Sequence, residues 1–533
     1  MMGLQRAVRL TAAALLSAVL GFGASSPTSA RTLPPLVAPS STGAPWSDAE
    51  RAALKVQLDG LFAKSAGIRG AHVGLYALTT RDGSLLYSRQ SDDEFMPAST
   101  LKLLVGSASL ARLGTGFRFH TEAFVTGTLA NGTQSGSLVV RGGGDPFLRI
   151  ADLEALASAV HAAGINAVAG DVAVDASYFD RQPYPPGWVW DDFPFYYAVK
   201  VSAASFQENV VHVVVNGGAR PGDPPTLSTE FPQTLLSQAD PPSTACEQNG
   251  ALLIVPGVLS ILPQATTGSG GSDSTVDAAR TREGCVAIVG SIPAGGSDTV
   301  DAAVPSPEAY LRGATILVLR KHNLYEQQAA ENGGPPQGGG ENYIGVGGEP
   351  KQTVWTHDSE PLPKLVADMW FPSDNLLAEL LLKSLGVARS GAPGTTENGA
   401  KFEREWLHSI GVDTHTVTLA DGSGLSIYDR ITPRDLVAIL QADWNGPNRH
   451  IVLDALPVAG VRGTLREEFV DTPAAGRAFV KTGSMTHVRG LAGFLQTRRH
   501  GSVTFALMVD DWNGDSDRLN DFRGSVLSAL LGS

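Results

Sequence analysis

The strand and helix patterns of this chain gather at its two ends, and this limits the folds open to it. Near the start, two strand-like runs flank Asp82-Gly83, a dipeptide typical of tight hairpin turns. Near the end, three strand-like runs precede a helical pattern over 517–531. These strands predict one antiparallel sheet built from both termini. The runs are 73–78, 84–87, 479–482, 490–496 and 503–509.

The residues between the two ends have a different composition. From about 119 to 350 they are rich in Gly, Pro, Val and Ala, with short strand-like runs and one helical pattern over 152–163. We therefore predict a mixed α/β fold, an antiparallel sheet flanked by helices, with smaller β-rich domains inserted. The predicted parts are a signal peptide at 1–30, a flexible lead-in at 31–46, the main domain at 47–120 and 346–533, and the insertion at 121–345.

The N-terminus has the pattern of a secretory signal. Arg6 and Arg9 precede an apolar run of about 13 residues, which is short for a membrane span, and Thr28-Ser29-Ala30 is a plausible cleavage site. An uncleaved anchor is the alternative. We expect an exported, periplasmic or extracytoplasmic protein. The formal net charge of −13 disfavours nucleic acid as a partner, because an acidic surface repels phosphate.

The two cysteines, Cys246 and Cys285, lie too far apart for a metal-binding spacing. In an oxidising compartment they could form a disulfide, and two buried free thiols are the alternative. The histidines His72, His357 and His487 are scattered without paired ligand spacing, so no metal site is expected.

Three short motifs carry the chemistry. In Ser99-Thr-Leu-Lys102 the serine and lysine share one helix face, so the amine could activate the hydroxyl as a nucleophile. By itself this spacing also arises by chance. Ser373-Asp374-Asn375 precedes a helix and could simply be its N-cap. Lys481-Thr482-Gly483 ends an apolar strand, where Gly483 would admit a ligand backbone and Lys481 would attract a carboxylate.

Taken together and in this order, the motifs resemble those of penicillin-binding proteins and serine β-lactamases. The chain resembles one family in particular, the class C low-molecular-mass penicillin-binding proteins, which are D-alanyl-D-alanine carboxypeptidases/endopeptidases. That family has two inserted domains, one nested in the other, which places the nested part at roughly 150–230. Further matching segments are Pro97-Ala-Ser-Thr-Leu-Lys102, Gly143-Gly-Asp145-Pro146, Gly170-Asp-Val with Asp175, Gly187-Trp-Val-Trp-Asp-Asp192, Asp421-Gly-Ser-Gly-Leu-Ser426, Pro457-Val-Ala-Gly460 and Lys481-Thr-Gly-Ser484.

The resemblance implies a role for each residue of the motifs. Ser99 would be the nucleophile and Lys102 its base, and Ser373 would relay a proton to the leaving amine. Asn375 would bind the substrate amide. Lys481 would tune the site electrostatically, Thr482 would bind the terminal carboxylate, and Gly483 would belong to the substrate-binding strand. The backbone N–H groups of Ser99 and Ser484 would form the oxyanion hole.

The sequence departs from the family at two places. Trp370-Phe371-Pro372 stands before Ser373 where a basic or polar residue is common. Ile427 stands where the family usually has an arginine that grips the charged end of the stem-peptide side chain, so recognition of diaminopimelate is in question. Arg430 could substitute for it. The family's side-chain pocket corresponds to Trp188, Asp191 and Tyr196, for which a local aromatic core is the alternative.

These features predict a serine-type D-Ala-D-Ala carboxypeptidase/endopeptidase that cleaves peptidoglycan stem peptides and is inhibited by β-lactams. The resemblance implies no cofactor, and it allows a peripheral association with the membrane or the cell wall. One alternative is a non-catalytic peptidoglycan-binding scaffold. A β-lactamase is the other, although no Glu-x-x-Leu-Asn occurs between Asn375 and Lys481 to activate the deacylating water.

Overall fold

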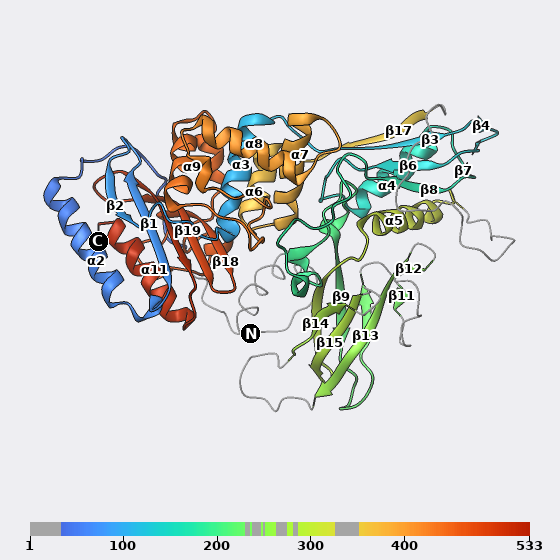
Figure 1. Cartoon of the computed structure of the whole chain (residues 1–533). Coiled ribbons are helices and arrows are strands. Elements are labelled where there is room, and N and C mark those ends of the chain that lie inside the picture. The colour runs from blue at the N-terminus through green and yellow to red at the C-terminus, as the bar shows by residue number, and fades with distance from the viewer. Residues whose placement is uncertain are drawn as a thin grey trace. The chain divides into compact units, whose positions relative to one another are not determined.

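The main sheet combines strands from both ends of the chain. Its five strands run in the order β18-β19-β20-β1-β2, and every neighbouring pair is antiparallel. Figure 1 shows the blue strands β1 and β2 together with the red strands β18 and β19. This confirms the sheet predicted from the two termini. The strands are β1 (His72–Thr79), β2 (Leu85–Arg89), β18 (Ala478–Met485), β19 (Val488–Gln496) and β20 (Ser502–Asp510). The computed structural model describes residues 33–229, 235–236, 247–248, 251–262, 274–280, 286–325 and 351–532.

The hairpin that joins β1 to β2 turns at the predicted dipeptide. Gly83 has a φ of 69°, in the left-handed region that glycine adopts without strain. The Asp82 carboxylate accepts hydrogen bonds from the Ser84 backbone N–H at 3.0 Å and from its hydroxyl at 2.6 Å. Local turn chemistry therefore specifies this corner of the sheet.

Side chains of β20 alternate between two hydrophobic cores. Phe505, Leu507 and Val509 belong to a core shared with helices α2 and α11. Ala506 and Met508 face the opposite core, which contains the other helices of the main domain. One strand thus serves two layers because its side chains have a period of two. The helices are α2 (Asp48–Lys64), α3 (Lys102–Arg112), α6 (Leu362–Trp370), α7 (Asn375–Ser390), α8 (Thr396–Ser409), α9 (Pro433–Asn445), α10 (Arg449–Ala455) and α11 (Ser516–Leu530).

The inserted part begins with a second sheet, in the order β17-β3-β6-β8, which shares a hydrophobic core with α4 and α5. The strand β17 pairs with β3, although we predicted it within the C-terminal part of the main domain. The boundary predicted at residue 346 therefore lies too early, because the alternating pattern of β17 does not reveal its partner. These elements are β3 (His120–Thr126), β6 (Leu138–Arg141), α4 (Ile150–Ala162), β8 (Val172–Asp175), α5 (Pro307–Lys321) and β17 (Lys351–Asp358), with a small sheet of β4 (Leu129–Ala130), β5 (Thr133–Gln134) and β7 (Ala167–Val168).

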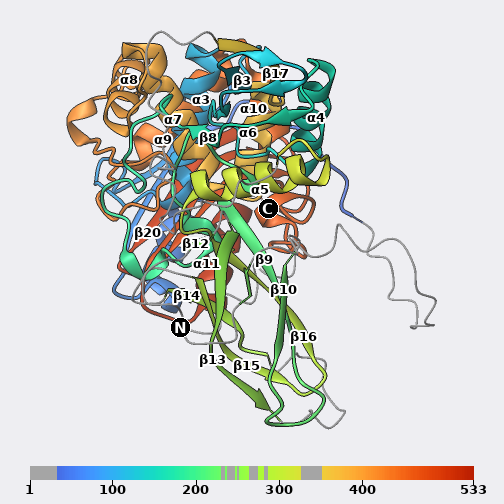
Figure 2. The same ribbon diagram turned by 90° about the vertical axis from the view of Figure 1, so that its right-hand side faces the viewer.

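The nested part lies later in the chain than predicted. Strands β9 to β16 form two further sheets, in the orders β10-β9-β16 and β11-β13-β15-β14, and their long strands are visible in Figure 2. The predicted range of roughly 150–230 includes β9 and β10, but it also contains α4 and β8, and β8 pairs with β6 of the preceding sheet. The strands are β9 (Val210–Asn216), β10 (Thr226–Thr229), β11 (Leu235–Leu236), β12 (Glu247–Gln248), β13 (Ala251–Leu262), β14 (Asp277–Arg280), β15 (Val286–Pro293) and β16 (Ser297–Ala303).

The described residues of the second unit just ahead of α2, 36–47, have no helix or strand but are hydrogen-bonded to the main domain. Residues Met1–Pro35 and Leu36–Ser533 are separate units, and within the second the Val37 N–H donates to the Gly476 carbonyl at 2.8 Å. Trp46 is buried and stacks on His500. The predicted signal peptide lies outside the described residues. Among the helices of the described part, none is long and apolar enough to cross a membrane.

Candidate active site

Ser99 and Lys102 lie where a short 3-10 turn, Ala98–Leu101, continues into α3. Ser99 is partly exposed and Lys102 is fully buried. Ala98 has a φ of 45°, a left-handed conformation that costs ~1–3 kcal/mol outside glycine. A Cβ on Gly424 would lie 1.9 Å from the Ala98 carbonyl oxygen. The backbone at Gly424 therefore packs directly against the strained turn that presents Ser99.

The Lys102 amine contacts three oxygen atoms. Its Nζ lies 2.9 Å from Ser99 Oγ, 2.5 Å from Asn375 Oδ1 and 2.7 Å from the Ser423 carbonyl oxygen. The Asn375 oxygen faces Lys102 because the amide nitrogen donates to the Tyr197 carbonyl at 2.7 Å. Two of the three oxygen atoms can only accept, so a neutral amine would donate its two hydrogens to them. Its lone pair would then face the Ser99 hydroxyl, which is the arrangement of a general base.

Burial lowers the pKa of Lys102 to about 8, against the opposing pull of the Asp421, Glu379 and Asp374 carboxyl groups. At this pKa about one molecule in ten carries the neutral amine at pH 7. The side chain is thus close to the balance that a base needs near neutral pH.

Ser373 and Asn375 are brought to Lys102 and Lys481 by the start of α7. The Asp374 side chain caps this helix by accepting from the Leu377 N–H at 2.9 Å. Asp374 therefore provides the N-cap that was the alternative interpretation of this motif. Ser373 has a φ of 69°, and its hydroxyl oxygen accepts from Lys481 Nζ at 2.8 Å. A strained residue in contact with a buried lysine is typical of a functional site.

Lys481 and Thr482 lie on β18, the edge strand of the main sheet next to the Ser99 turn. Lys481 is fully buried. Burial and the neighbouring Lys102 charge lower the pKa of Lys481 well below its ordinary value. A Cβ on Gly483 would lie 2.7 Å from the Pro97 carbonyl oxygen, so glycine allows this close approach. Ser484 is exposed.

The residues predicted for a side-chain pocket separate into two groups. Trp188 is 8% exposed, and its indole N–H donates to Asp421 Oδ2 at 2.8 Å. Asp191 and Tyr196 are exposed. The same segment contacts the 421–428 loop through the Ile427 N–H, which donates to the Gly187 carbonyl at 3.2 Å. The inserted part therefore borders the site, and Trp188 lies beneath its surface.

Three residues of the site carried no role in the sequence analysis. The Trp370 indole N–H donates to the Lys102 carbonyl at 2.9 Å, and Tyr197 fixes Asn375 through its backbone. Asp421 accepts from three donors in the loop around Ser423 and from Trp188. The segment Asp421–Ser426 was noticed only as part of the family resemblance, which assigned it no contact.

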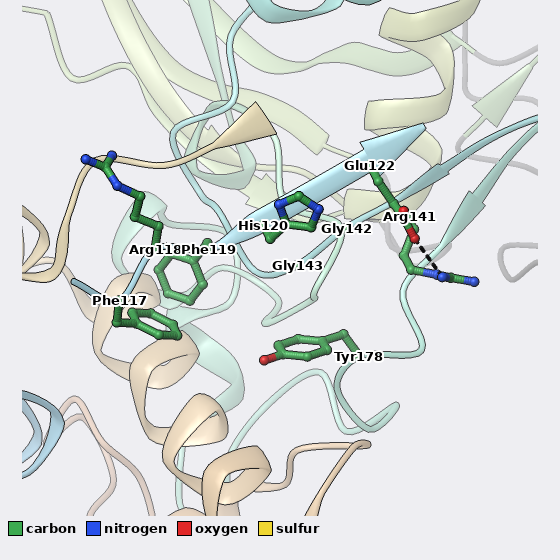
Figure 3. Close-up of a pocket in the computed structure, with 9 residues that line it drawn as sticks. All are labelled: Phe117, Arg118, Phe119, His120, Glu122, Arg141, Gly142, Gly143 and Tyr178. Carbon is green, nitrogen blue, oxygen red and sulfur yellow. Dashed lines mark hydrogen bonds and ion pairs between the residues drawn. The ribbon is translucent and has the colours of Figure 1, made fainter. Parts of the chain in front are cut away.

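A pocket of about 180 Å³ lies elsewhere, between β3, β6 and the loop after β8 (Figure 3). Phe117, Phe119 and Tyr178 supply its aromatic lining. Arg141 at its edge is paired with Glu122 at 2.7 Å and with Asp175 at 2.8 Å. None of the motif residues lines this pocket. Within the described ranges, no group of three or more His, Cys, Asp or Glu side chains could hold a metal ion.

Both predicted disulfide partners, Cys246 and Cys285, lie outside the described residues. Their pairing therefore stays a prediction.

Known proteins are similar to this chain in sequence and in fold. The family model of the D-Ala-D-Ala carboxypeptidase 3 (S13) family matches residues 54–257 and 325–527. A D-alanyl-D-alanine carboxypeptidase of Actinomadura sp. (strain R39) is 30% identical over 485 residues, which is 88% of this chain and 83% of the relative. D-alanyl-D-alanine carboxypeptidase DacB of Haemophilus influenzae is 25% identical over 83% of this chain and 86% of its own length.

The crystal structure of penicillin binding protein 4 from Haemophilus influenzae superposes with a TM-score of 0.72 at 23% identity, covering 89% of this chain and 99% of that one. This likeness confirms the predicted fold class. The family model spans most of the chain, and the two relatives match over more than four-fifths of each partner. The chain therefore belongs to the D-Ala-D-Ala carboxypeptidase 3 (S13) family.

Proposed function

We propose that this enzyme, a D-Ala-D-Ala carboxypeptidase by family, cleaves peptidoglycan stem peptides through an acyl-enzyme on Ser99. The observation that carries this assignment is the set of contacts around Lys102. When the amine is neutral, Asn375 and Ser423 would accept both of its hydrogens, so its lone pair would face Ser99 Oγ, 2.9 Å away. A serine needs such a neighbouring base to become a nucleophile.

In the first step, Ser99 Oγ attacks the carbonyl carbon of the D-Ala-D-Ala bond while its proton passes to Lys102. The developing oxyanion would be held by the backbone N–H groups of Ser99 and Ser484, each worth ~2.7–4 kcal/mol in the transition state. The amine of the terminal D-Ala leaves after it takes a proton through Ser373, whose oxygen lies 2.8 Å from Lys481 Nζ. Water then attacks the acyl-enzyme, and Ser99 Oγ recovers its proton.

We assign substrate binding to the exposed side of β18. An edge strand can pair with an extended peptide, which suits the backbone of a stem peptide. The terminal carboxylate would lie near Thr482 and Gly483, where the Thr482 hydroxyl also lies 2.9 Å from that of Thr464. A bound anion would favour the protonated form of Lys481, whose pKa is lowered by burial in the free enzyme.

The stem-peptide side chain would extend toward Asp191 and Tyr196, at the surface above Trp188. Ile427 is 40% exposed and Tyr428 is 56% exposed, so the border of this region is apolar. The Arg430 guanidinium donates to the carbonyls of Ile427 and Asp429, at 2.9 and 2.7 Å. These contacts fold Arg430 against its own loop and do not favour it as a substitute for the family's arginine.

The assignment also fits β-lactam inhibition at a peptidoglycan-facing location outside the cytoplasm. A structure of penicillin binding protein 4 from Haemophilus influenzae is described in complex with a novel β-lactam. A non-catalytic scaffold would form no covalent adduct with penicillin, and a β-lactamase would turn the drug over without a stall. We expect a burst of acylation followed by slow release.

The test is covalent labelling with a fluorescent penicillin, with the adduct counted by intact-protein mass spectrometry. Wild type should take up one label per chain. Ser99→Ala should take up none while retaining its melting temperature, and Lys102→Ala should label far more slowly because the hydroxyl lacks its base. A stoichiometric adduct on Ser99→Ala would refute the assignment of the nucleophile. Mass spectrometry of digested peptidoglycan would then show whether D-Ala is released, cross-links are cut, or both.

A further inference from the structure

The loop that contacts Lys102 is held from below by a buried carboxylate. Asp421 Oδ2 accepts from the Ser423 hydroxyl at 2.9 Å, the Ser426 N–H at 2.8 Å and the Trp188 indole at 2.8 Å. Its Oδ1 accepts from the Gly424 N–H at 2.7 Å. Four donors converge on one fully buried side chain. This fixes the backbone on both sides of Ser423.

A second buried carboxyl group holds the same loop from α7. Glu379 accepts from the Ser423 N–H at 2.8 Å and from the Gly422 N–H at 3.0 Å. The peptide units around Ser423 are thereby fixed, with the Ser423 carbonyl oxygen 2.7 Å from Lys102 Nζ. Neither Asp421 nor Glu379 touches Ser99, so neither reaches the reacting atoms.

We propose that Asp421 and Glu379 are positioning residues that hold Lys102 in the orientation of a general base toward Ser99. By holding the Ser423 carbonyl on Lys102 they orient the amine toward Ser99, and Asp421 also acts electrostatically on the amine. This inference rests on the proposed roles of Ser99 and Lys102. It adds the loop that supports Lys102 to the machinery of the site.

Among the carboxyl groups that raise the pKa of Lys102, Asp421 has the largest effect. Burial, reinforced by the charges of Glu379 and Asp421, raises the pKa of Glu403 well above its ordinary value, and neither of its oxygens has a hydrogen-bond partner within the described structure. Burial and the adjacent Asp421 likewise raise the pKa of Asp429 well above normal. Burial, with Asp421 next to it, raises the pKa of Glu379 to about 8. Burial therefore favours the neutral form of these three neighbours, and Asp421 is the carboxyl group on which four donors converge.

The effect of Asp421 on the base has a definite sign. The charged groups that face Lys102 are Asp421, Glu379 and Asp374, which raise the pKa of Lys102, and Lys481 across the site. Replacing Asp421 with asparagine removes one attraction for the ammonium form. The neutral amine would then form at lower pH, while the loop, with an amide facing backbone donors, would no longer hold its position.

The test is the second-order rate constant for acylation by benzylpenicillin, measured from pH 5.5 to 10.5. We expect Asp421→Asn to lower the alkaline plateau by ~10–100-fold, since a shift of about 1 Å in a reacting group can cost that much. The acid limb of its pH profile, where the rate rises as Lys102 loses its proton, should move to lower pH. Glu379→Gln should reduce the rate in the same way with a smaller pH shift, because Glu379, with a pKa of about 8, is already mostly protonated near neutral pH.

The matched control is Asp443→Asn. Asp443 is another buried carboxyl group, whose pKa burial raises to about 7, and it accepts from Ser107 at 2.7 Å instead of from the loop. Asp443→Asn should keep the wild-type acid limb. Melting temperatures of all variants show which are folded, and Glu379→Gln decides the matter if Asp421→Asn does not fold.

The outcomes separate this inference from the function on which it rests. If Asp421→Asn and Glu379→Gln acylate like wild type, or lose rate with an unmoved acid limb, positioning of the base by these carboxyl groups is wrong. A Ser99→Ala variant measured in parallel must remain unlabelled. A label on Ser99→Ala would instead overturn the proposed nucleophile, whatever the Asp421 variant shows.

Discussion

Replacing Asn375 with aspartate would place a new charge directly beside the base. Asn375 Oδ1 lies 2.5 Å from Lys102 Nζ, and an aspartate side chain has nearly the same shape as the asparagine that it replaces. A carboxylate this close to an ammonium group raises its pKa by ~1–3 units. The amide that donates to the Tyr197 carbonyl would also be lost.

The expected loss of rate follows from the population of neutral amine. With the pKa of Lys102 at about 8, roughly one molecule in ten is neutral at pH 7. A rise of ~1–3 units reduces this population ~10–1,000-fold, and acylation at pH 7 should slow by the same factor. The difference should shrink as the pH rises, since the lysine then loses its proton in both proteins.

The assay is stopped-flow acylation by a chromogenic β-lactam between pH 5.5 and 10.5, with Asn375→Ala as the control. The alanine variant loses the same hydrogen bonds without gaining a charge, so its acid limb should not move to higher pH. An Asn375→Asp profile with the wild-type acid limb would refute the assignment of Lys102 as the titrating base.

Three further predictions address other parts of the chain. Thiol titration of the unreduced, denatured protein should find no free thiol if Cys246 and Cys285 are paired, and two thiols would contradict the disulfide. Trp370→Phe should lower the free energy of unfolding in urea by ~2–4 kcal/mol, because it leaves a cavity at a fully buried site and removes the indole hydrogen bond to Lys102. Wild type should turn over acylated and free diaminopimelyl side chains at similar kcat/KM, and Ile427→Arg should restore a ~10–100-fold preference for the free end. A strong wild-type preference that the arginine leaves unchanged would show that another group recognises this end.

The sequence was informative wherever the structure depends on neighbours along the chain. The Asp82-Gly83 turn and the position of Ser99 at a helix start could be predicted because they follow from local turn chemistry and helical spacing. The two faces of β20 could not be assigned in advance, since its residues are buried on both sides and its pattern is nearly continuous.

Contacts between distant segments were invisible to the same reasoning. The pairing of β17 with β3 and the bond from Trp188 to Asp421 join residues more than 200 positions apart. The spacing of apolar residues identifies a strand but not its partner. Likewise, no side-chain pattern could reveal that the Tyr197 carbonyl orients Asn375, because a backbone atom makes the contact.

The split main sheet affects how the chain can fold. Strand β1 hydrogen-bonds to β20 through eight residue pairs, beginning with His72 and Asp510, and about 400 residues separate them. During synthesis from the N-terminus, β1 and β2 emerge long before their partners. Until the last strands are made they remain a hairpin without its sheet, and the edge of β1 that later pairs with β20 is open to pairing with other chains. Loss of the final strands would therefore leave the N-terminal hairpin without the sheet that buries it.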